Sequence, residues 1–299
     1  MAAFRTLKVF VMGQDPRSLK SIELLNWTGL AFVGKRSQIA QARDRKELQE
    51  PGVYMLIGDD DAASGLVDIY VGETDDFAKR INDHVSKKEW WDTFVVFVSK
   101  DRYLTKAHVR WLEKSLYHSA KAAVGTLNVR NDKEPNGAAL PESDEHAMQE
   151  FYQNLIFVLE TMGHTYFDAV ARPQFVADGS DVAKFQMTLP KEIGKGDLKG
   201  YLEVREGSFI LLKGSYIRAQ VQDSFQTANS GYFALWTKIT ASDAVRKTDV
   251  EGALQTTRDI EFKSVSAAGA IVRGRATNGK TDWKRVADGK PYAECFGDD

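Results

Sequence analysis

The sequence predicts a mixed α/β (α+β) protein: a small antiparallel three-stranded sheet flanked by helices, plus a smaller C-terminal α/β unit with a β-hairpin. Three observations support this. Strand-like runs at 53–57 and 68–72 flank turn-forming residues, the pattern of a β-hairpin. Apolar residues at helical spacing follow the hairpin. Residues 171–199 are rich in Gly, Pro, Asp and Lys and have little periodicity, which predicts a boundary.

We therefore expect a first domain over residues 1–170, a linker over 171–198 and a small C-terminal domain over 199–299. A chain of 299 residues is long enough for one large domain or for two ordinary domains that each have a core. A hydrophobic content of 43% is typical of a folded protein and argues against disorder.

Composition also limits the class of function. The longest apolar runs are too short to cross a membrane, and the first residues carry charges among apolar positions, unlike a secretory signal. We therefore expect a cytoplasmic protein without membrane contacts. A single cysteine, Cys295, excludes an intramolecular disulfide and a cysteine cluster for zinc. The formal net charge of -2 means that any phosphate-binding surface must be local.

The elements before and within the predicted sheet follow from local pattern. Residues 4–12 are expected to form an opening strand, although their alternation is imperfect. Residues 38–50 are polar enough for a solvated helix that ends before Pro51. The continuous apolar run at 94–98 is predicted to be the third strand of the sheet.

Three helices are expected around this sheet. Thr74 is a suitable N-cap for the first, which carries apolar residues at a four-residue interval, namely Phe77, Ile81 and Val85. Apolar stripes predict the other two helices over 105–124 and 143–162, and Gly163 is expected to end the last one. The residues between them, 126–146, have the composition of a polar loop.

The C-terminal unit has fewer clear signals. Alternating strands at 201–205 and 209–213 are joined tightly enough for a hairpin, and residues 231–256 are mixed and partly helical. Residues 264–275 are predicted to form a helix of small residues with a serine at its start and arginines at its end. Asn278-Gly279 is typical of a turn.

Several polar residues remain once the apolar faces are assigned. Tyr54 and Tyr70 can project from one face of the hairpin if the register pairs them, although both are also ordinary strand formers. Arg80 and His84 are one helical turn apart and point the same way. Glu113 lies at the edge of a buried stripe, where a carboxylate needs a partner, although a salt-bridged surface glutamate is the simpler interpretation.

These residue types suit metal-assisted cleavage of a phosphodiester. A carboxylate can hold one divalent cation, an arginine can stabilise a pentavalent phosphate, and a phenol or imidazole can take a proton from water. An asparagine near residue 130 completes the polar set.

The ordered motifs resemble those of the GIY-YIG nuclease superfamily. The resemblance rests on Gly52-Val53-Tyr54, Tyr70-Val71-Gly72, Arg80, His84, and Glu113 within a Trp-Leu-Glu helix, and it is strong over residues 50–135. The segments 26–29 and 264–283 are similar to a bacterial subgroup whose nuclease domain precedes a small uncharacterised C-terminal domain. The resemblance implies a DNA endonuclease and leaves RNA open as a second substrate.

Carried to these positions, the resemblance implies that Glu113 binds a single Mg²⁺ or Mn²⁺. Tyr54 would orient or deprotonate the attacking water, with His84 as the other candidate for proton transfer. Tyr70 would hydrogen-bond the phosphate or water, and Arg80 would stabilise developing charge. Because an ordinary tyrosine has a pKa near ~10, base action by Tyr54 would need a nearby cation.

Three departures from the family pattern stand out. The interval between the tyrosine motifs is longer than usual, with 59–66 as the extra length, and its aspartates at 59–61 would repel DNA. Both motifs carry valine where isoleucine is typical, a change of one methylene. The supporting asparagine is either Asn128, favoured by spacing, or Asn131, favoured by its loop context.

Two other roles stay open at this point. A domain of this type could serve as a catalytically weak nucleic-acid-binding or assembly subunit that acts with a partner protein. The C-terminal domain could recruit that partner, support a homodimer, or bind DNA through a basic set, against the alternative of a merely solvated basic edge. This basic set comprises Arg273, Arg275, Lys280, Lys284 and Arg285.

Overall fold

The computed structural model describes residues 4–60, 66–167, 183–194, 197–205 and 207–296. It confirms the mixed α/β class. Two compact units are present: the first comprises Met1–Asp59, Val67–Lys121 and Asn128–Phe167, and the second Asp60–Leu66, Ala122–Leu127 and Asp168–Asp299. The chain therefore leaves the first unit and returns to it twice before the long second segment begins.

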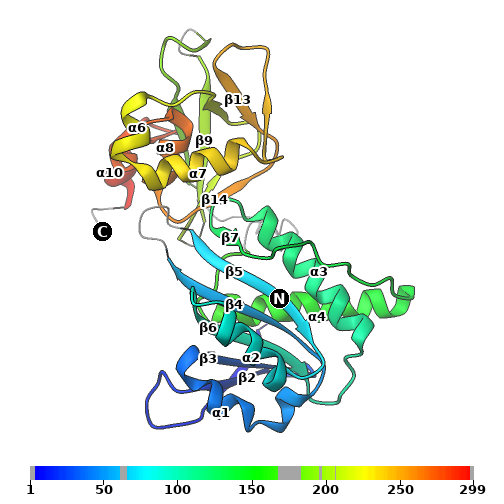
Figure 1. The fold of residues 1–299 in the computed structure, drawn as a ribbon. Helices are drawn as coiled ribbons and strands as arrows, with labels where there is room; N and C mark the ends of the chain where they lie inside the picture. Colours follow the sequence, from blue (N-terminus) through cyan, green and yellow to red (C-terminus); the bar gives the residue numbers. More distant parts are fainter. Residues whose placement is uncertain (1–3, 61–65, 168–182, 195–196, 206, 297–299) are drawn as a thin grey trace. The chain divides into compact units, whose positions relative to one another are not determined.

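A seven-stranded sheet forms the centre of the first unit (Figure 1). In spatial order it contains β1 (Leu7–Val11), β2 (Lys20–Leu24), β3 (Gly29–Lys35), β6 (Trp91–Ser99), β4 (Gly52–Asp60), β5 (Val67–Thr74) and β7 (Leu127–Val129). The three strands expected from sequence are neighbours within it, as β6, β4 and β5. The opening strand is also confirmed, and β2 and β3 connect it to β6.

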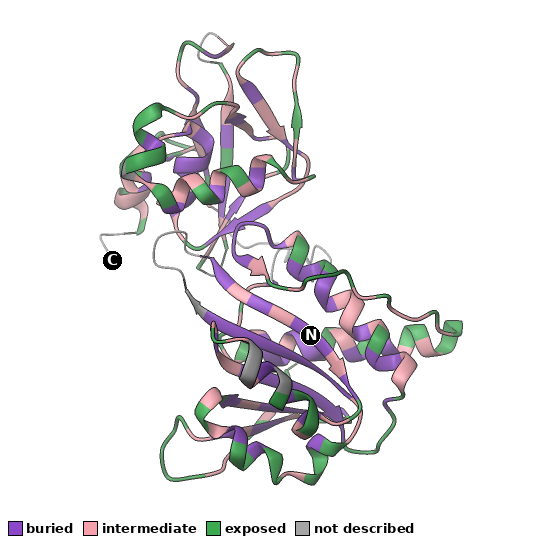
Figure 2. Ribbon diagram, viewed as in Figure 1, coloured by how far each residue is buried: buried purple, intermediate pink, exposed green. Residues whose placement is uncertain are grey.

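The two faces of this sheet carry different helices. On one face, α1 (Ile39–Arg43) and α2 (Phe77–Lys87) cover alternate side chains of the central strands, including Tyr54, Leu56, Phe94 and Val96. On the other face, Phe151 of α4 (Glu142–Thr161) packs on Trp27, which in turn contacts Phe97. Figure 2 shows the central strands buried along most of their length.

Helix α3 (Lys106–Ala122) carries its apolar stripe inward and joins α4 through a hydrogen bond between Ser119 and Tyr152. Both predicted helices, over 105–124 and 143–162, are thus confirmed, and Gly163 follows α4 with a φ of +88°. The expected polar loop 126–146 is wrong in one respect, because it contains the short strand β7.

Two other local predictions are wrong. Residues 38–50 do not form one helix: α1 ends at Arg43 and a 3₁₀ helix, η2 (Lys46–Gln49), follows after a break. The N-cap of α2 is Asp76, whose carboxylate accepts a hydrogen bond from the Lys79 backbone at 3.1 Å. Thr74 instead ends β5.

The second unit contains two sheets. One has the order β14 (Ile260–Phe262), β10 (Ser208–Leu211), β9 (Lys199–Arg205), β8 (Ala183–Thr188) and β15 (Lys284–Arg285). The other has β11 (Tyr216–Arg218), β13 (Ala253–Thr256) and β12 (Val245–Lys247). The predicted hairpin corresponds to the antiparallel pair β9 and β10. The described helices of this unit are α6 (Asp223–Ala228), α7 (Ser230–Thr240), α8 (Val265–Arg273), α9 (Gly279–Asp282) and α10 (Tyr292–Phe296).

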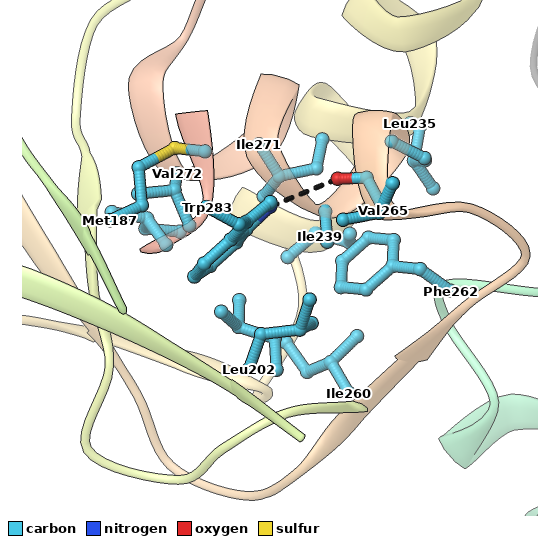
Figure 3. Close-up of a cluster of buried hydrophobic side chains, with 14 of the residues drawn as sticks. Met187, Leu202, Leu235, Ile239, Ile260, Phe262, Val265, Ile271, Val272 and Trp283 are labelled. Atoms are coloured by element: carbon cyan, nitrogen blue, oxygen red, sulfur yellow. Dashed lines mark hydrogen bonds between the residues drawn. The ribbon is translucent and has the colours of Figure 1, made fainter. Parts of the chain in front are cut away.

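The core of this unit surrounds α8, the helix of small residues expected from sequence. Ser264 caps it by accepting a hydrogen bond from the Ala267 backbone at 3.1 Å. Figure 3 shows Trp283 among the aliphatic side chains, with its indole Nε1 donating to the carbonyl oxygen of Val265 at 3.0 Å. Asn278, predicted in a turn, caps α9. Within the described residues, no helix has the length and apolarity needed to cross a membrane.

Candidate active site

Tyr54 and Tyr70 lie side by side on the face of the sheet that α2 covers. Their ring centroids are 6.2 Å apart, so the expectation that both project from one face is confirmed. Tyr54 is completely buried, and its ring also contacts Phe77 of α2, with 5.4 Å between centroids. Tyr70 is only partly buried, and it is therefore the phenol nearer to solvent.

Gly72 makes room for the Tyr54 ring. A Cβ atom at position 72 would lie 2.5 Å from both the Tyr54 hydroxyl oxygen and the ring carbon that bears it. Side chains at 70 and 72 share one face of β5, because successive residues of a strand alternate. The spacing Tyr70-Val71-Gly72 therefore places a tyrosine and a side-chain gap on the same face, and Tyr54 fills the gap.

His84 comes from the exposed edge of α2 in sequence, yet it is buried between the two tyrosines. The Tyr54 hydroxyl is 2.7 Å from Nε2 of His84, which is a hydrogen bond. The imidazole ring is also close to Tyr70, with 4.9 Å between centroids. The helical interval of four residues between Arg80 and His84 brings both to this group.

The Arg80 guanidinium lies beside the phenols of both tyrosines, which raise its pKa. Burial and the adjacent Tyr70 raise the pKa of Tyr54 far above its usual value, although Arg80 has the opposite effect. Burial also raises the pKa of Tyr70, against the lowering effect of the Arg80 charge. Both phenols are therefore neutral near pH 7, and each can donate a proton in a hydrogen bond.

Glu113 of α3 is half-buried next to the end of β5, where its carboxyl group lies close to the backbone of Glu73. Burial, followed by the charge of Glu73, raises the pKa of Glu113 to about 7. Glu73 itself is paired with Lys106 at 2.7 Å and with Arg110 at 3.9 Å. Glu113 is thus a carboxylate held close to a like charge, as expected where a cation is to bind.

The structure separates the two candidate asparagines. The Asn131 side chain accepts a hydrogen bond from the Val71 backbone N–H at 3.0 Å and donates one to the Val71 carbonyl at 2.8 Å. It therefore braces the residue between Tyr70 and Gly72. Asn128 instead donates to Asp68 at 2.7 Å, and Asp68 also pairs with Arg130.

Within the described residues, Glu113 forms no ion pair, whereas the neighbouring Glu73 is paired with Lys106 and Arg110. Among the described residues, no group of three or more His, Cys, Asp and Glu side chains could hold a metal. Mg²⁺ does not need such a cage, since it commonly binds one or two carboxylates together with waters and substrate phosphates. Glu113, with its raised pKa and the repulsion from Glu73, fits that mode.

The predicted basic set lies in the second unit, and two of its members have acidic partners there. Arg273 pairs with Asp282 at 3.0 Å, and Arg285 pairs with Asp288. Lys284 is exposed on β15, whereas Arg275 and Lys280 are partly buried. The aspartates reduce the positive charge that the sequence suggested for this surface. Residues 61–65 and the side chains of Asp59 and Asp60, where the acidic tip was expected, lie outside the described part.

Sequence reasoning missed one charged residue at the site. Lys88 places its Nζ atom 4.3 Å from the centroid of the Tyr70 ring. The signal was present, because 80, 84 and 88 continue a single four-residue interval along α2. Lys88 was missed because it lies just beyond the last residue of α2, and the site residues were assigned from positions within the helix.

Comparison with known proteins gives one match. Residues 192–295, within the second unit, match the family model described as Domain of unknown function (DUF4357). No curated protein and no solved structure matches the chain.

Proposed function

We propose that this protein is a metal-dependent endonuclease of the GIY-YIG type that hydrolyses DNA phosphodiester bonds. The observation that carries the proposal is the convergence of a hydrogen-bonded Tyr54–His84 pair with Arg80 beside it and Tyr70 packed against it. Glu113, on the separate helix α3, lies next to the end of β5, the strand that carries Tyr70. A group of ordinary core residues would not combine an arginine, an imidazole and two phenols in this way.

His84 is the better proton acceptor of the two candidates. Burial raises the Tyr54 pKa and keeps the phenol neutral, and this phenol can donate a hydrogen bond to Nε2 in the His84 tautomer that has its hydrogen on Nδ1. Tyr54 is buried in this structure, so an attacking water would have to enter beside its hydroxyl together with the substrate. It would then lose a proton to the phenol oxygen as the phenol proton moves to Nε2. Tyr54 orients the nucleophile and passes on the proton, and His84 holds it.

Arg80 and Tyr70 suit the phosphate. The guanidinium lies beside both phenols, and its exposed position on α2 allows it to meet an incoming phosphodiester. Its charge would stabilise the negative charge that develops on the phosphate oxygens during attack. Tyr70, the more accessible phenol, would donate to one of the same oxygens.

Glu113 would hold the Mg²⁺ or Mn²⁺ ion, with waters and the substrate phosphate as the remaining ligands. The bound cation supplies positive charge for the pentavalent phosphate and for the leaving oxygen. Glu73, paired with Lys106 and Arg110, would keep the backbone that orients Glu113 in place.

The proposal includes the cytoplasm as the compartment, in keeping with a single free cysteine. One site per chain also means that a double-strand break would need a dimer or two successive nicks. A catalytically weak binding or assembly subunit would be the alternative, and it predicts nucleic-acid binding without turnover.

The test uses supercoiled plasmid and a labelled RNA of matched sequence, each with Mg²⁺, with Mn²⁺ and with chelator. We expect metal-dependent nicking of the plasmid, which Glu113→Gln and Arg80→Ala each abolish. Glu145→Gln, an exposed carboxylate on α4, and Lys79→Ala, an exposed lysine on α2, are matched controls that should retain activity. Thermal melting checks that the inactive variants are folded.

Two results would contradict the proposal. Cleavage by the Glu113 and Arg80 variants at the wild-type rate would exclude this site as its source. Binding of DNA by the wild type without cleavage in either metal would favour the binding or assembly role.

A further inference from the structure

Helix α2 presents a line of three basic side chains toward the tyrosines. Arg80, His84 and Lys88 are each one helical turn apart, so they project from the same side. Lys88 is the C-cap residue, and its backbone N–H still donates to the His84 carbonyl at 2.9 Å. The line of side chains therefore continues one residue past the helix.

The backbone at Lys88 is held by Arg36. The Arg36 guanidinium donates to the carbonyl oxygens of Lys88 at 2.6 Å and of Val85 at 2.8 Å, and it lies over the Trp91 ring at 4.9 Å. An arginine that binds two carbonyls at the end of a helix fixes the position of that end. The backbone of Lys88 is therefore held in a fixed position beside the site.

Lys88 also has a charge that no described acidic side chain neutralises. Its half-buried side chain runs to the face of Tyr70, where the ammonium makes a cation–π contact. Across the described residues, no carboxylate forms an ion pair with it. In contrast, Lys79 on the same helix pairs with Asp76 at 3.0 Å, and Lys106 pairs with both Glu73 and Asp75.

We propose that Lys88 binds a backbone phosphate of the DNA next to the one that is cleaved, and thereby positions the substrate over Tyr70. This inference rests on the proposed function of the same site. The Lys88 ammonium has three N–H donors. One of them faces the Tyr70 ring, so the other two can donate to phosphate oxygens. Lys88 is a positioning residue, and it takes no part in proton transfer.

The experiment measures binding and cleavage separately. Binding of a short fluorescein-labelled DNA duplex is followed by anisotropy in EDTA, where turnover is absent, and cleavage kinetics of the same duplex are measured with Mn²⁺. The variants are Lys88→Gln, Lys88→Arg and, as the matched control, Lys79→Gln. Each phosphate contact contributes about 0.9 to the slope of log K against log salt.

We expect Lys88→Gln to raise both Kd and KM while kcat stays within about twofold of wild type. The ratio of the variant Kd to the wild-type Kd should fall about 3.5-fold between about 50 and about 200 mM salt, the effect of one lost phosphate contact. Lys88→Arg should restore the salt slope, and Lys79→Gln should leave it unchanged.

An unchanged Kd and salt slope in Lys88→Gln would overturn the phosphate contact, even if the wild type cleaves DNA. A lower kcat with unchanged Kd would also overturn it, because that result would assign Lys88 to support of the Tyr70 ring alone. If the wild type binds DNA through Lys88 but never cleaves it, hydrolysis fails as the function while the contact stands. Absence of any binding overturns both.

Discussion

Replacing Asn131 by alanine tests whether β5, the strand that carries Tyr70, depends on the side-chain hydrogen bonds that Asn131 makes to its backbone. β7 ends at Val129, and the chain continues beside β5 with the Arg130 backbone N–H donating to Ile69 at 2.7 Å. The Asn131 side chain then makes both of the bonds that a further strand residue would make to Val71. Alanine removes the acceptor and the donor together.

The expected cost follows from those two bonds. Each net hydrogen bond contributes about 0.5–1.5 kcal/mol, so their loss should reduce the free energy of unfolding by about 1–3 kcal/mol. Val71 is fully buried, which limits how well water can replace the amide at its backbone. A shift of about 1 Å in β5 would displace the Tyr70 phenol and Gly72, and it could lower cleavage about 100-fold.

Asn128→Ala is the matched control. It removes one bond to Asp68, a carboxylate that keeps Arg130 as a partner. Urea denaturation gives the free energy of unfolding for both variants, and single-turnover cleavage of plasmid at saturating protein gives the rate. Equal losses in the two variants, or wild-type stability and rate in Asn131→Ala, would refute the assignment of Asn131 as the brace.

Two further predictions concern Gly72 and His164. Gly72→Ala should move the Tyr54 ring, because the new Cβ would lie 2.5 Å from the phenol oxygen. We expect the free energy of unfolding to fall by about 1–3 kcal/mol and the folded fraction to lose cleavage. A crystal structure of the variant with the 2.7 Å Tyr54–His84 bond intact would contradict this. Burial lowers the pKa of His164, so the unfolded chain binds its proton first and stability should fall as the pH drops below about 6.5. His164→Gln should weaken that dependence in melting curves, and parallel curves for the two proteins would refute it.

Much of the first unit could be predicted from local pattern. The hairpin, α2, α3 and α4 have strong periodicity, and the apolar run at 94–98 became the central part of β6. β2 and β3 were missed because Lys20–Leu24 is short and Gly29–Lys35 has no polar side chain before Lys35, so it lacks the alternation of a half-exposed strand. β7 was missed because three residues in a polar segment carry no periodic signal.

The candidate site could be predicted in part for the same reason. Residues one helical turn apart point together, so Arg80 and His84 could be paired from sequence alone. The partners of single residues could not be predicted. Spacing favoured Asn128, but the chain places Asn131 at Val71, and the basic appearance of Arg273 and Arg285 did not reveal Asp282 and Asp288 beside them.

The sequence by itself determined a hairpin with one tyrosine in each strand, the arginine and histidine on one side of α2, and a glutamate at the edge of a buried stripe. Only the tertiary structure decided how these groups act on each other: Tyr54 is buried under α2 in the gap at Gly72, its phenol is neutral and bonded to His84, and Lys88 lies on the ring of Tyr70. The physical reason is that periodicity reports the direction of a side chain along its own element. Burial, pKa and hydrogen-bond partners depend on the elements that pack against it, and those come from distant parts of the chain.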